Sequence, residues 1–135
     1  DANKIKELGV ELVSIEDVLK ESDIISIHAM LTRETENMIG TKELKMMKNS
    51  ALLINTARGQ IVNEKALLNA LKNGIIAGAA IDVFSVEPIE KGNDLVKYAK
   101  NHDNLLLTPH IGASTEETIR DAAIYIAKKI KEHIR

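Results

Sequence analysis

Blocks of apolar residues alternate with amphipathic stretches along the chain, and this alternation predicts strands followed by helices. The apolar blocks are nearly continuous aliphatic runs without a regular two-residue period, as is typical of strands buried on both faces of a sheet. In the stretches between them, apolar residues recur three or four positions apart, which predicts helices that pack on the sheet. The predicted strands are Val10–Val13, Asp23–Ala29, Ala51–Thr56, Ile75–Val83 and Asn104–Thr108.

Capping residues mark the predicted ends of the helices. Ser14 with Asp17, and Ser114 with Glu117, each form the pattern of a capping box. Gly9 is expected to end a helix that has already begun before it. The predicted helices cover Lys4–Leu8, Ile15–Glu21, Thr41–Lys48, Asn63–Asn73, Asp94–Lys100 and a last segment from Ser114 to about His133.

This order of strands and helices indicates βαβ units, and therefore a parallel sheet in an α/β fold. Right-handed crossovers place the carboxyl ends of all the strands at one edge, where ligands bind in open α/β sheets. Arg58, Glu87 and His110 follow three successive strands, so we expect their side chains to face one crevice. If these strands are neighbours, their ends span about 10 Å, because strands lie roughly 4.8 Å apart. That width suits one small substrate.

The three residue types together suit the chemistry of an acid substrate. An arginine grips a carboxylate through two parallel hydrogen bonds. A carboxylate beside a histidine favours the charged imidazole and so supports proton transfer. Each residue also has a plainer interpretation: Arg58 as a solvated loop charge, Glu87 as a surface carboxylate, and His110 as a histidine held only by its turn. Their equivalent positions after three strands favour the functional interpretation over coincidence.

Two further titratable residues lie at the ends of predicted strands. Asp82 ends a buried strand, where an acid needs a partner or a ligand group. His28 ends an earlier strand, where partial burial in the core and contact with a ligand are both open. No pair of residues has the HExxH spacing of a zinc site, so we expect no metal.

Composition and charge exclude several classes of protein. The 135 residues suffice for one domain with a core. The net charge of −2 gives no basic footprint for nucleic acid or an anionic membrane. No apolar run approaches the roughly 20 residues that span a bilayer, and no signal peptide opens the sequence. There is no cysteine, which fits a reducing compartment. We therefore expect a soluble, cytoplasmic protein.

Several peptides resemble the D-isomer-specific 2-hydroxyacid dehydrogenases. They are Asn55-Thr56-Ala57-Arg58-Gly59, Asp82-Val83-Phe84 with Glu87-Pro88, and Thr108-Pro109-His110-Ile111-Gly112, supported by Glu7–Val13 and Ser22–His28. Within that family, the continuation from Gly112 through Glu116 is most similar to the D-3-phosphoglycerate dehydrogenases.

This resemblance implies a Rossmann-type dinucleotide-binding domain and an NAD-dependent reaction, the oxidation of D-3-phosphoglycerate to 3-phosphohydroxypyruvate in serine biosynthesis. It implies that Arg58 holds the substrate carboxylate and carbonyl oxygen, and that His110 is the acid/base at the C2 oxygen. Glu87 then bonds the other ring nitrogen of His110 and stabilises its charged form. The implied cofactor contacts are His28, Thr56, Ala57, Arg58, Asp82, His110, Ile111 and Gly112, with Asp82 receiving the nicotinamide carboxamide.

The resemblance also leads to expectations about domain organisation. The GxGxxG fingerprint and its βαβ unit are not in the 135 residues, so we expect only the second half of the domain, with residues 114–135 as a helix leading toward a substrate domain. The isolated chain is then expected to bind NAD weakly, to be inactive, and to associate through an unpaired apolar edge. The whole protein is expected to act on a small 2-hydroxy or 2-oxo acid as a homodimer or higher oligomer.

Three alternatives remain open from the sequence. One is another D-2-hydroxyacid dehydrogenase, such as a glyoxylate or hydroxypyruvate reductase or a D-lactate dehydrogenase. The second is a non-catalytic, NAD-responsive binding module of the corepressor type. The third is a purely structural role, as an assembly domain with an inactive site.

Overall fold

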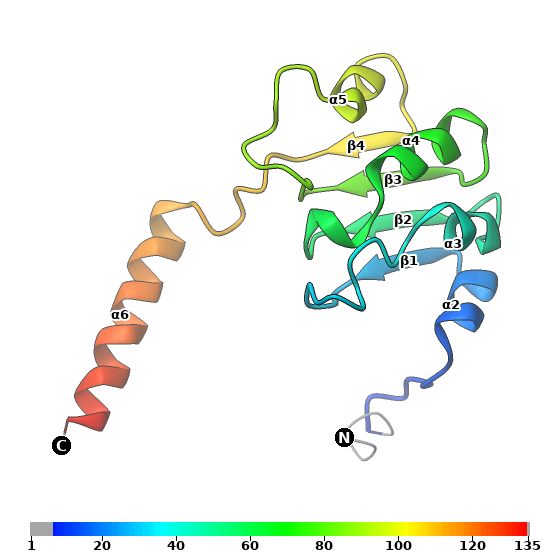
Figure 1. The fold of residues 1–135 in the computed structure, drawn as a ribbon. Coiled ribbons are helices and arrows are strands. Elements are labelled where there is room, and N and C mark those ends of the chain that lie inside the picture. Colours follow the sequence, from blue (N-terminus) through cyan, green and yellow to red (C-terminus); the bar gives the residue numbers. More distant parts are fainter. Residues whose placement is uncertain (1–6, 135) are drawn as a thin grey trace.

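A computed structural model describes residues 7–134, and its centre is one sheet of four parallel strands (Figure 1). The strands lie in the order β1-β2-β3-β4, so chain order and spatial order agree. Each of the four longer predicted strands is present, though shorter than its apolar run, because the ends of the runs continue into loops. The strands are β1 (Ile24–Ile27), β2 (Leu52–Asn55), β3 (Gly78–Ile81) and β4 (Leu105–Leu107).

Helices connect the strands, and polar side chains cap several of them. Ser14 accepts a hydrogen bond from the main chain of Asp17 and begins the first described helix, as the sequence predicts. Asn63 and Asn93 cap two later helices in the same way. The helices are α2 (Ile15–Glu21), α3 (Thr41–Met46), α4 (Glu64–Lys72), α5 (Asp94–Ala99) and α6 (Glu116–His133), with a 3₁₀ turn, η1, at Gly59–Ile61.

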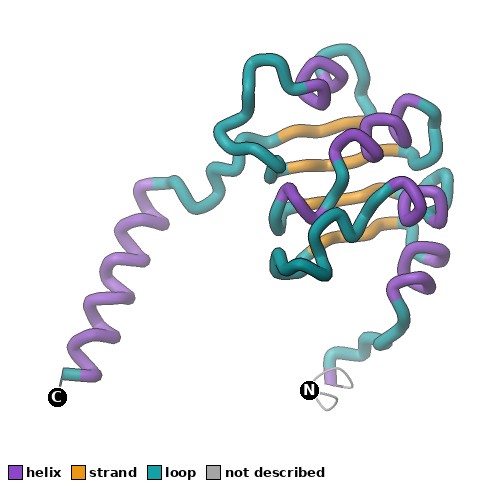
Figure 2. The backbone as a smooth tube through the Cα atoms, in the orientation of Figure 1, coloured by secondary structure: helices purple, strands orange, loops and turns teal. Residues whose placement is uncertain are grey.

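The hydrophobic core lies between the sheet and the helices packed on one of its faces. The sequence suggests strands buried on both faces, but along β1 and β2 the side chains alternate: Ile25 and Leu53 point into the core, while Ile24 and Leu52 remain exposed. Leu67 of α4 is fully buried against this inner face. In the orientation shared by Figure 1 and Figure 2, α3 and α4 lie in front of the strands, and loops lie at the strand ends. The packing of the helices on the sheet therefore fixes where the loops that follow the strands begin.

Two further sequence predictions are corrected by the structure. Residues 10–13 form no strand; Val10, Leu12 and Val13 are exposed. A strand needs a partner, and this segment runs away from the sheet before α2 begins (Figure 1). The last helix is capped by Thr115, which accepts from the main chain of Thr118, and not by Ser114. The predicted Lys4–Leu8 helix lies mostly outside the described residues.

The α6 helix extends away from the sheet, and none of its residues is buried (Figure 1). Several of its apolar side chains, including Ile119, Ile126 and Ile130, are more than half exposed. Within residues 7–134, no helix combines the length and the apolar character that crossing a membrane requires.

Candidate active site

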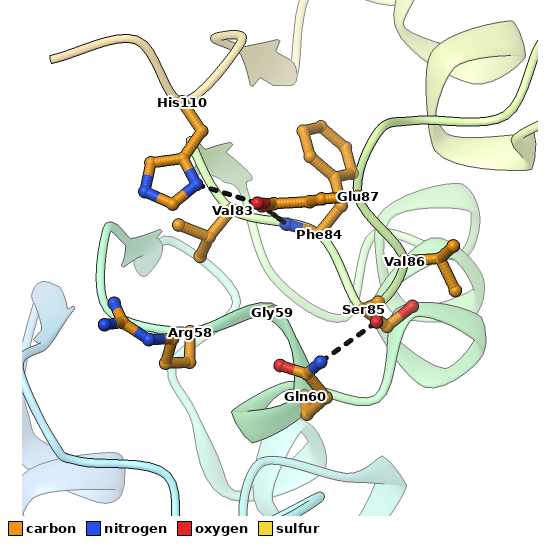
Figure 3. Close-up of a pocket in the computed structure, with 9 residues that line it drawn as sticks. All are labelled: Arg58, Gly59, Gln60, Val83, Phe84, Ser85, Val86, Glu87 and His110. Carbon is orange, nitrogen blue, oxygen red and sulfur yellow. Dashed lines mark hydrogen bonds and ion pairs between the residues drawn. The ribbon is translucent and has the colours of Figure 1, made fainter. Parts of the chain in front are cut away.

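Arg58, Glu87 and His110 line one pocket at the carboxyl edge of the sheet (Figure 3). They come from the loops after β2, β3 and β4, three neighbouring parallel strands. The pocket has a volume of about 540 Å³. Its other lining residues are Gly59, Gln60, Val83, Phe84, Ser85 and Val86. The parallel topology therefore brings together three side chains that are far apart in the sequence.

Glu87 and His110 form a hydrogen-bonded pair. Glu87 Oε2 lies 2.9 Å from His110 Nδ1, and Glu87 Oε1 accepts from the main-chain N–H of Phe84 at 2.8 Å. The Phe84 hydrogen bond first, and the His110 side chain second, hold the pKa of Glu87 below its usual value. The side chains of His110 and Glu87 remain 43% and 37% exposed, so a small molecule can reach the pair. The second ring nitrogen of His110 points away from Glu87 (Figure 3).

Asp82 holds the loop that carries His110. Its Oδ1 atom accepts from the main-chain N–H of His110 at 3.1 Å and also from the hydroxyl of Thr108. His110 has a φ of 52°, in the left-handed region that few residues other than glycine adopt. Such a conformation persists only where neighbouring contacts impose it. The Asp82 carboxylate supplies one such contact to the main chain of His110, and Glu87 contacts the His110 side chain.

A buried amide, Asn55, holds the loop that carries Arg58. Asn55 Oδ1 accepts from the N–H of Ala57 at 3.1 Å, and its Nδ2 donates to the carbonyl of Arg58 at 3.0 Å. Asn55 is 1% exposed, and among the described residues it is the polar side chain that is buried with the apolar core. Arg58 itself is exposed, and its Nη1 donates to the carbonyl of Ala57 at 2.6 Å. The loop backbone is thus fixed while the guanidinium can still face a ligand.

Gly59 brings the loops after β2 and β3 into contact. A Cβ atom at this position would clash with the main chain of Phe84 and Ser85, so only glycine permits the approach. Sequence reasoning gave no role to Gly59 or to Asn55. The glycine directly after Arg58 and the amide at the end of an apolar run were the available signals. The Gly59 contact depends on a segment distant in the sequence, whereas the Asn55 amide forms hydrogen bonds with residues two and three positions later in the same loop.

A second pocket lies at the ends of β1 and β2 and shares Arg58 with the first. Its volume is about 530 Å³, and His28, Thr56 and Ala57 are among its lining residues, together with Ala29, Met30 and Leu31. His28 Nε2 lies 2.9 Å from the hydroxyl of Ser26. Ile111 and Gly112 are exposed and belong to neither set of lining residues. Of the eight predicted cofactor contacts, the second pocket thus contains His28, Thr56, Ala57 and Arg58, and the first contains His110 as well as Arg58. Asp82, Ile111 and Gly112 line neither pocket.

The side chains of the first pocket can bind an acid and transfer a proton. A guanidinium at one side of the first pocket can bind a carboxylate in two parallel hydrogen bonds. An imidazole paired with a carboxylate can give or take a proton at its free nitrogen. An acid substrate with a reactive oxygen next to its carboxylate fits both groups at once.

Comparison with known proteins gives a family match over most of the chain. Residues 1–112 match the family model described as D-isomer specific 2-hydroxyacid dehydrogenase, NAD binding domain. The chain is 50% identical over 125 residues to a glyoxylate reductase from Thermococcus litoralis, covering 93% of this chain and 36% of that protein. It is 43% identical over 129 residues to D-3-phosphoglycerate dehydrogenase 3, chloroplastic, from Arabidopsis thaliana, covering 96% of this chain and 21% of that protein. The chain therefore spans about a third or less of these curated relatives.

Solved structures show the same fold. A glyoxylate reductase from Paecilomyes thermophila superposes with a TM-score of 0.80 at 34% identity, covering 96% of this chain and 38% of that one. The NAD-complexed form of a D-isomer specific 2-hydroxyacid dehydrogenase from Lactobacillus delbrueckii ssp. bulgaricus gives a TM-score of 0.74 at 37% identity, covering 91% of this chain and 42% of that one.

Proposed function

Because the chain belongs to the D-isomer specific 2-hydroxyacid dehydrogenases, as part of their NAD-binding domain, we propose that the whole protein is an NAD-dependent oxidoreductase of small 2-hydroxy and 2-oxo acids. The observation that carries this proposal is the single pocket that contains Arg58 and the Glu87–His110 pair. An acid substrate needs both a cationic grip and a proton donor, and this pocket provides the two.

In this proposal each of the three residues has a distinct role. Arg58 binds the substrate carboxylate and orients the adjacent oxygen. His110 gives a proton to the C2 oxygen during reduction, or takes it during oxidation, through the ring nitrogen that does not face Glu87. Glu87 accepts from the other ring nitrogen, orients the imidazole and stabilises its charged form. Asp82 fixes the main chain that presents the imidazole.

NAD fits the remaining polar groups of this edge. The second pocket adjoins the first at Arg58, and its lining residues Thr56, Ala57 and His28 would hold part of the dinucleotide. Asp82 accepts from Thr108 and from the main chain of His110 through Oδ1, and its second carboxylate oxygen, Oδ2, would accept from the amide group of the cofactor. When bound, NAD supplies the two-electron redox chemistry. The protein side chains position the substrate and move the proton.

The substrate is proposed from the identities of the relatives. The relatives named glyoxylate reductase reach 50% identity, against 43–44% for those named D-3-phosphoglycerate dehydrogenase. We therefore place a small 2-oxo acid such as glyoxylate or hydroxypyruvate first, with Arg58 binding its carboxylate. Oxidation of D-3-phosphoglycerate is the second candidate, favoured by the match to its dehydrogenases.

A substrate comparison in the whole protein tests the proposal. We expect NADH oxidation with glyoxylate or hydroxypyruvate to exceed that with 3-phosphohydroxypyruvate in kcat/KM. The reverse order would favour the second candidate. His110→Ala should lower turnover by about 10²–10⁴-fold, the usual contribution of acid–base catalysis. His102→Ala is the matched control, because His102 stacks on Tyr98 away from the pocket. Near-normal kinetics for His110→Ala would refute the assignment.

We also propose that the whole protein is a homodimer or higher oligomer. The support is the exposed apolar surface of α6, where Ile119, Ile126 and Ile130 are each more than half exposed. Sedimentation analysis of the whole protein gives the oligomeric state directly, and a monomer at tens of micromolar protein would contradict this part of the proposal.

A further inference from the structure

The main chain of Ser85 is held by two side chains from the segment that follows Arg58. Glu64 Oε1 accepts from the Ser85 N–H at 2.6 Å, and Gln60 Nε2 donates to the Ser85 carbonyl oxygen at 3.0 Å. Figure 3 shows the second of these contacts at the lower end of the pocket. Ser85 lies two residues before Glu87. The loop that carries Glu87 is therefore attached, through its backbone, to the segment that carries Arg58.

Glu64 is a firm anchor for this attachment. It is the first residue of α4, a helix that buries Leu67 and Leu71 in the core. A hydrogen bond from a peptide N–H to an ionised carboxylate is about twice as strong as one between neutral groups. Glu64 is itself partly buried, which limits competition from water. The position of the loop at Ser85 therefore depends on the position of α4.

The attachment reinforces two other contacts around the pocket. Gly59 packs against the main chain of Phe84, and the N–H of Phe84 donates to Glu87. The main chain of Phe84 and Ser85 is thus held by residues of the segment that follows β2. Glu87 in turn contacts His110 on the far side of the pocket. A chain of contacts runs from the Arg58 segment through Ser85 and Glu87 to the imidazole.

We propose that Glu64 and Gln60 are positioning residues that set the place of the Glu87–His110 pair relative to Arg58. The catalytic consequence rests on the proposed function. Loss of the Glu64 contact releases the Glu87 loop but leaves Arg58 in place, because Asn55 holds the Arg58 backbone independently. The proton-transfer step should therefore suffer more than substrate binding.

An ordinary structural role for Glu64 predicts a different result. Acidic residues in the first turn stabilise a helix by interacting with its dipole, and removing one costs typically 0.3–1 kcal/mol in stability. That role involves the charge of Glu64 and not its hydrogen bond to Ser85. Glu64→Gln removes the charge but keeps an oxygen that can accept from the Ser85 N–H. The conservative variant therefore separates the two roles.

The test compares Glu64→Ala, Glu64→Gln and Gln60→Ala in the whole protein. Lys65→Ala is the matched control, because Lys65 is the next residue of α4 and is exposed. One readout is kcat and KM for glyoxylate reduction with NADH. The other is hydrogen exchange of the segment 84–88, measured by mass spectrometry, which needs no activity.

We expect Glu64→Ala to lower kcat by about tenfold, within the range that misplacement of a catalytic group can cost, while KM stays within twofold. Exchange of segment 84–88 should become faster. Glu64→Gln should restore most of both values, and Lys65→Ala should leave both unchanged. A kcat for Glu64→Ala within twofold of the parent overturns the inference, as does a rise in KM without a fall in kcat.

The remaining outcomes are also decisive. If Glu64→Ala does not fold, Gln60→Ala removes the other contact to Ser85 and decides by the same two readouts. If the parent protein reduces no 2-oxo acid, the proposed function fails, and hydrogen exchange alone decides whether Glu64 holds the loop. Unchanged exchange in Glu64→Ala would then overturn the inference as well.

Discussion

The Nδ1 atom of His110 lies 2.9 Å from Oε2 of Glu87, so a histidine after β4 and a carboxylate after β3 form one pair across neighbouring strands. The two residues are separated by more than twenty positions in the sequence, and the parallel topology alone brings them together. Because both side chains keep part of their surface exposed, a ligand can contact the pair while the hydrogen bond between them is kept.

Glu87→Gln should lower the rate of 2-oxo acid reduction. The amide keeps an oxygen near Nδ1 of His110 but removes the negative charge that supports the imidazole in the proposed mechanism. We expect kcat/KM at neutral pH to fall by about tenfold. Steady-state kinetics of the whole protein measure this. A parental kcat/KM would argue against a catalytic role for the pair.

The same substitution should alter stability at low pH. Hydrogen bonds from Phe84 and His110 lower the pKa of folded Glu87, so its ionised form contributes stability above the unfolded value of about 4.3. This contribution is lost as the pH falls through the lowered, folded value. The parent should therefore exceed Glu87→Gln in stability near pH 6, and the difference should shrink below about pH 4. Urea unfolding across this range is the measurement, with Glu90→Gln, in the same loop, as control.

Arg58→Lys should weaken substrate binding more than turnover. A lysine keeps the positive charge but cannot form two parallel hydrogen bonds to a carboxylate. We expect KM for the 2-oxo acid to rise by about tenfold or more, corresponding to loss of one charged hydrogen bond. Steady-state kinetics with the whole protein test this. A lysine variant with parental KM would show that Arg58 does not grip the substrate.

Gly59→Ala should destabilise the fold and disturb the Glu87 loop. The added Cβ meets the main chain of Phe84 and Ser85, which cannot move aside without shifting the loop. Overpacking of this kind typically costs about 1–3 kcal/mol. Gly92→Ala is the matched control, because a Cβ there has no neighbour within 4 Å. Denaturant unfolding of both variants gives the comparison. Equal stabilities would contradict the close approach.

The strands and the placement of the three site residues could be predicted from the sequence because each depends on a local pattern. A buried strand shows as an aliphatic run, and in a parallel sheet the residue after each run lies at the same edge. Arg58, Glu87 and His110 were found by that rule.

Features that depend on pairing between distant segments, or on the exact backbone conformation of a loop, could not be predicted in this way. Residues 10–13 have the composition of a strand, but no described segment pairs with them. Asn55 ends an aliphatic run and gives no local sign that its amide closes the loop after it. The contact of Gly59 with Phe84 joins two loops that are more than twenty residues apart in the sequence, so no short pattern contains it.

The way in which Ser85 is held determines which amino acids position 85 can accept during evolution. Gln60 and Glu64 contact only the peptide groups of Ser85, and every amino acid except proline supplies the same N–H and C=O groups. Position 85 is therefore open to change, and it lines the pocket where a different side chain would meet a different substrate. A substitution at position 85 can change the pocket without releasing the loop. Gln60 and Glu64, in contrast, must be kept for the loop to stay in place.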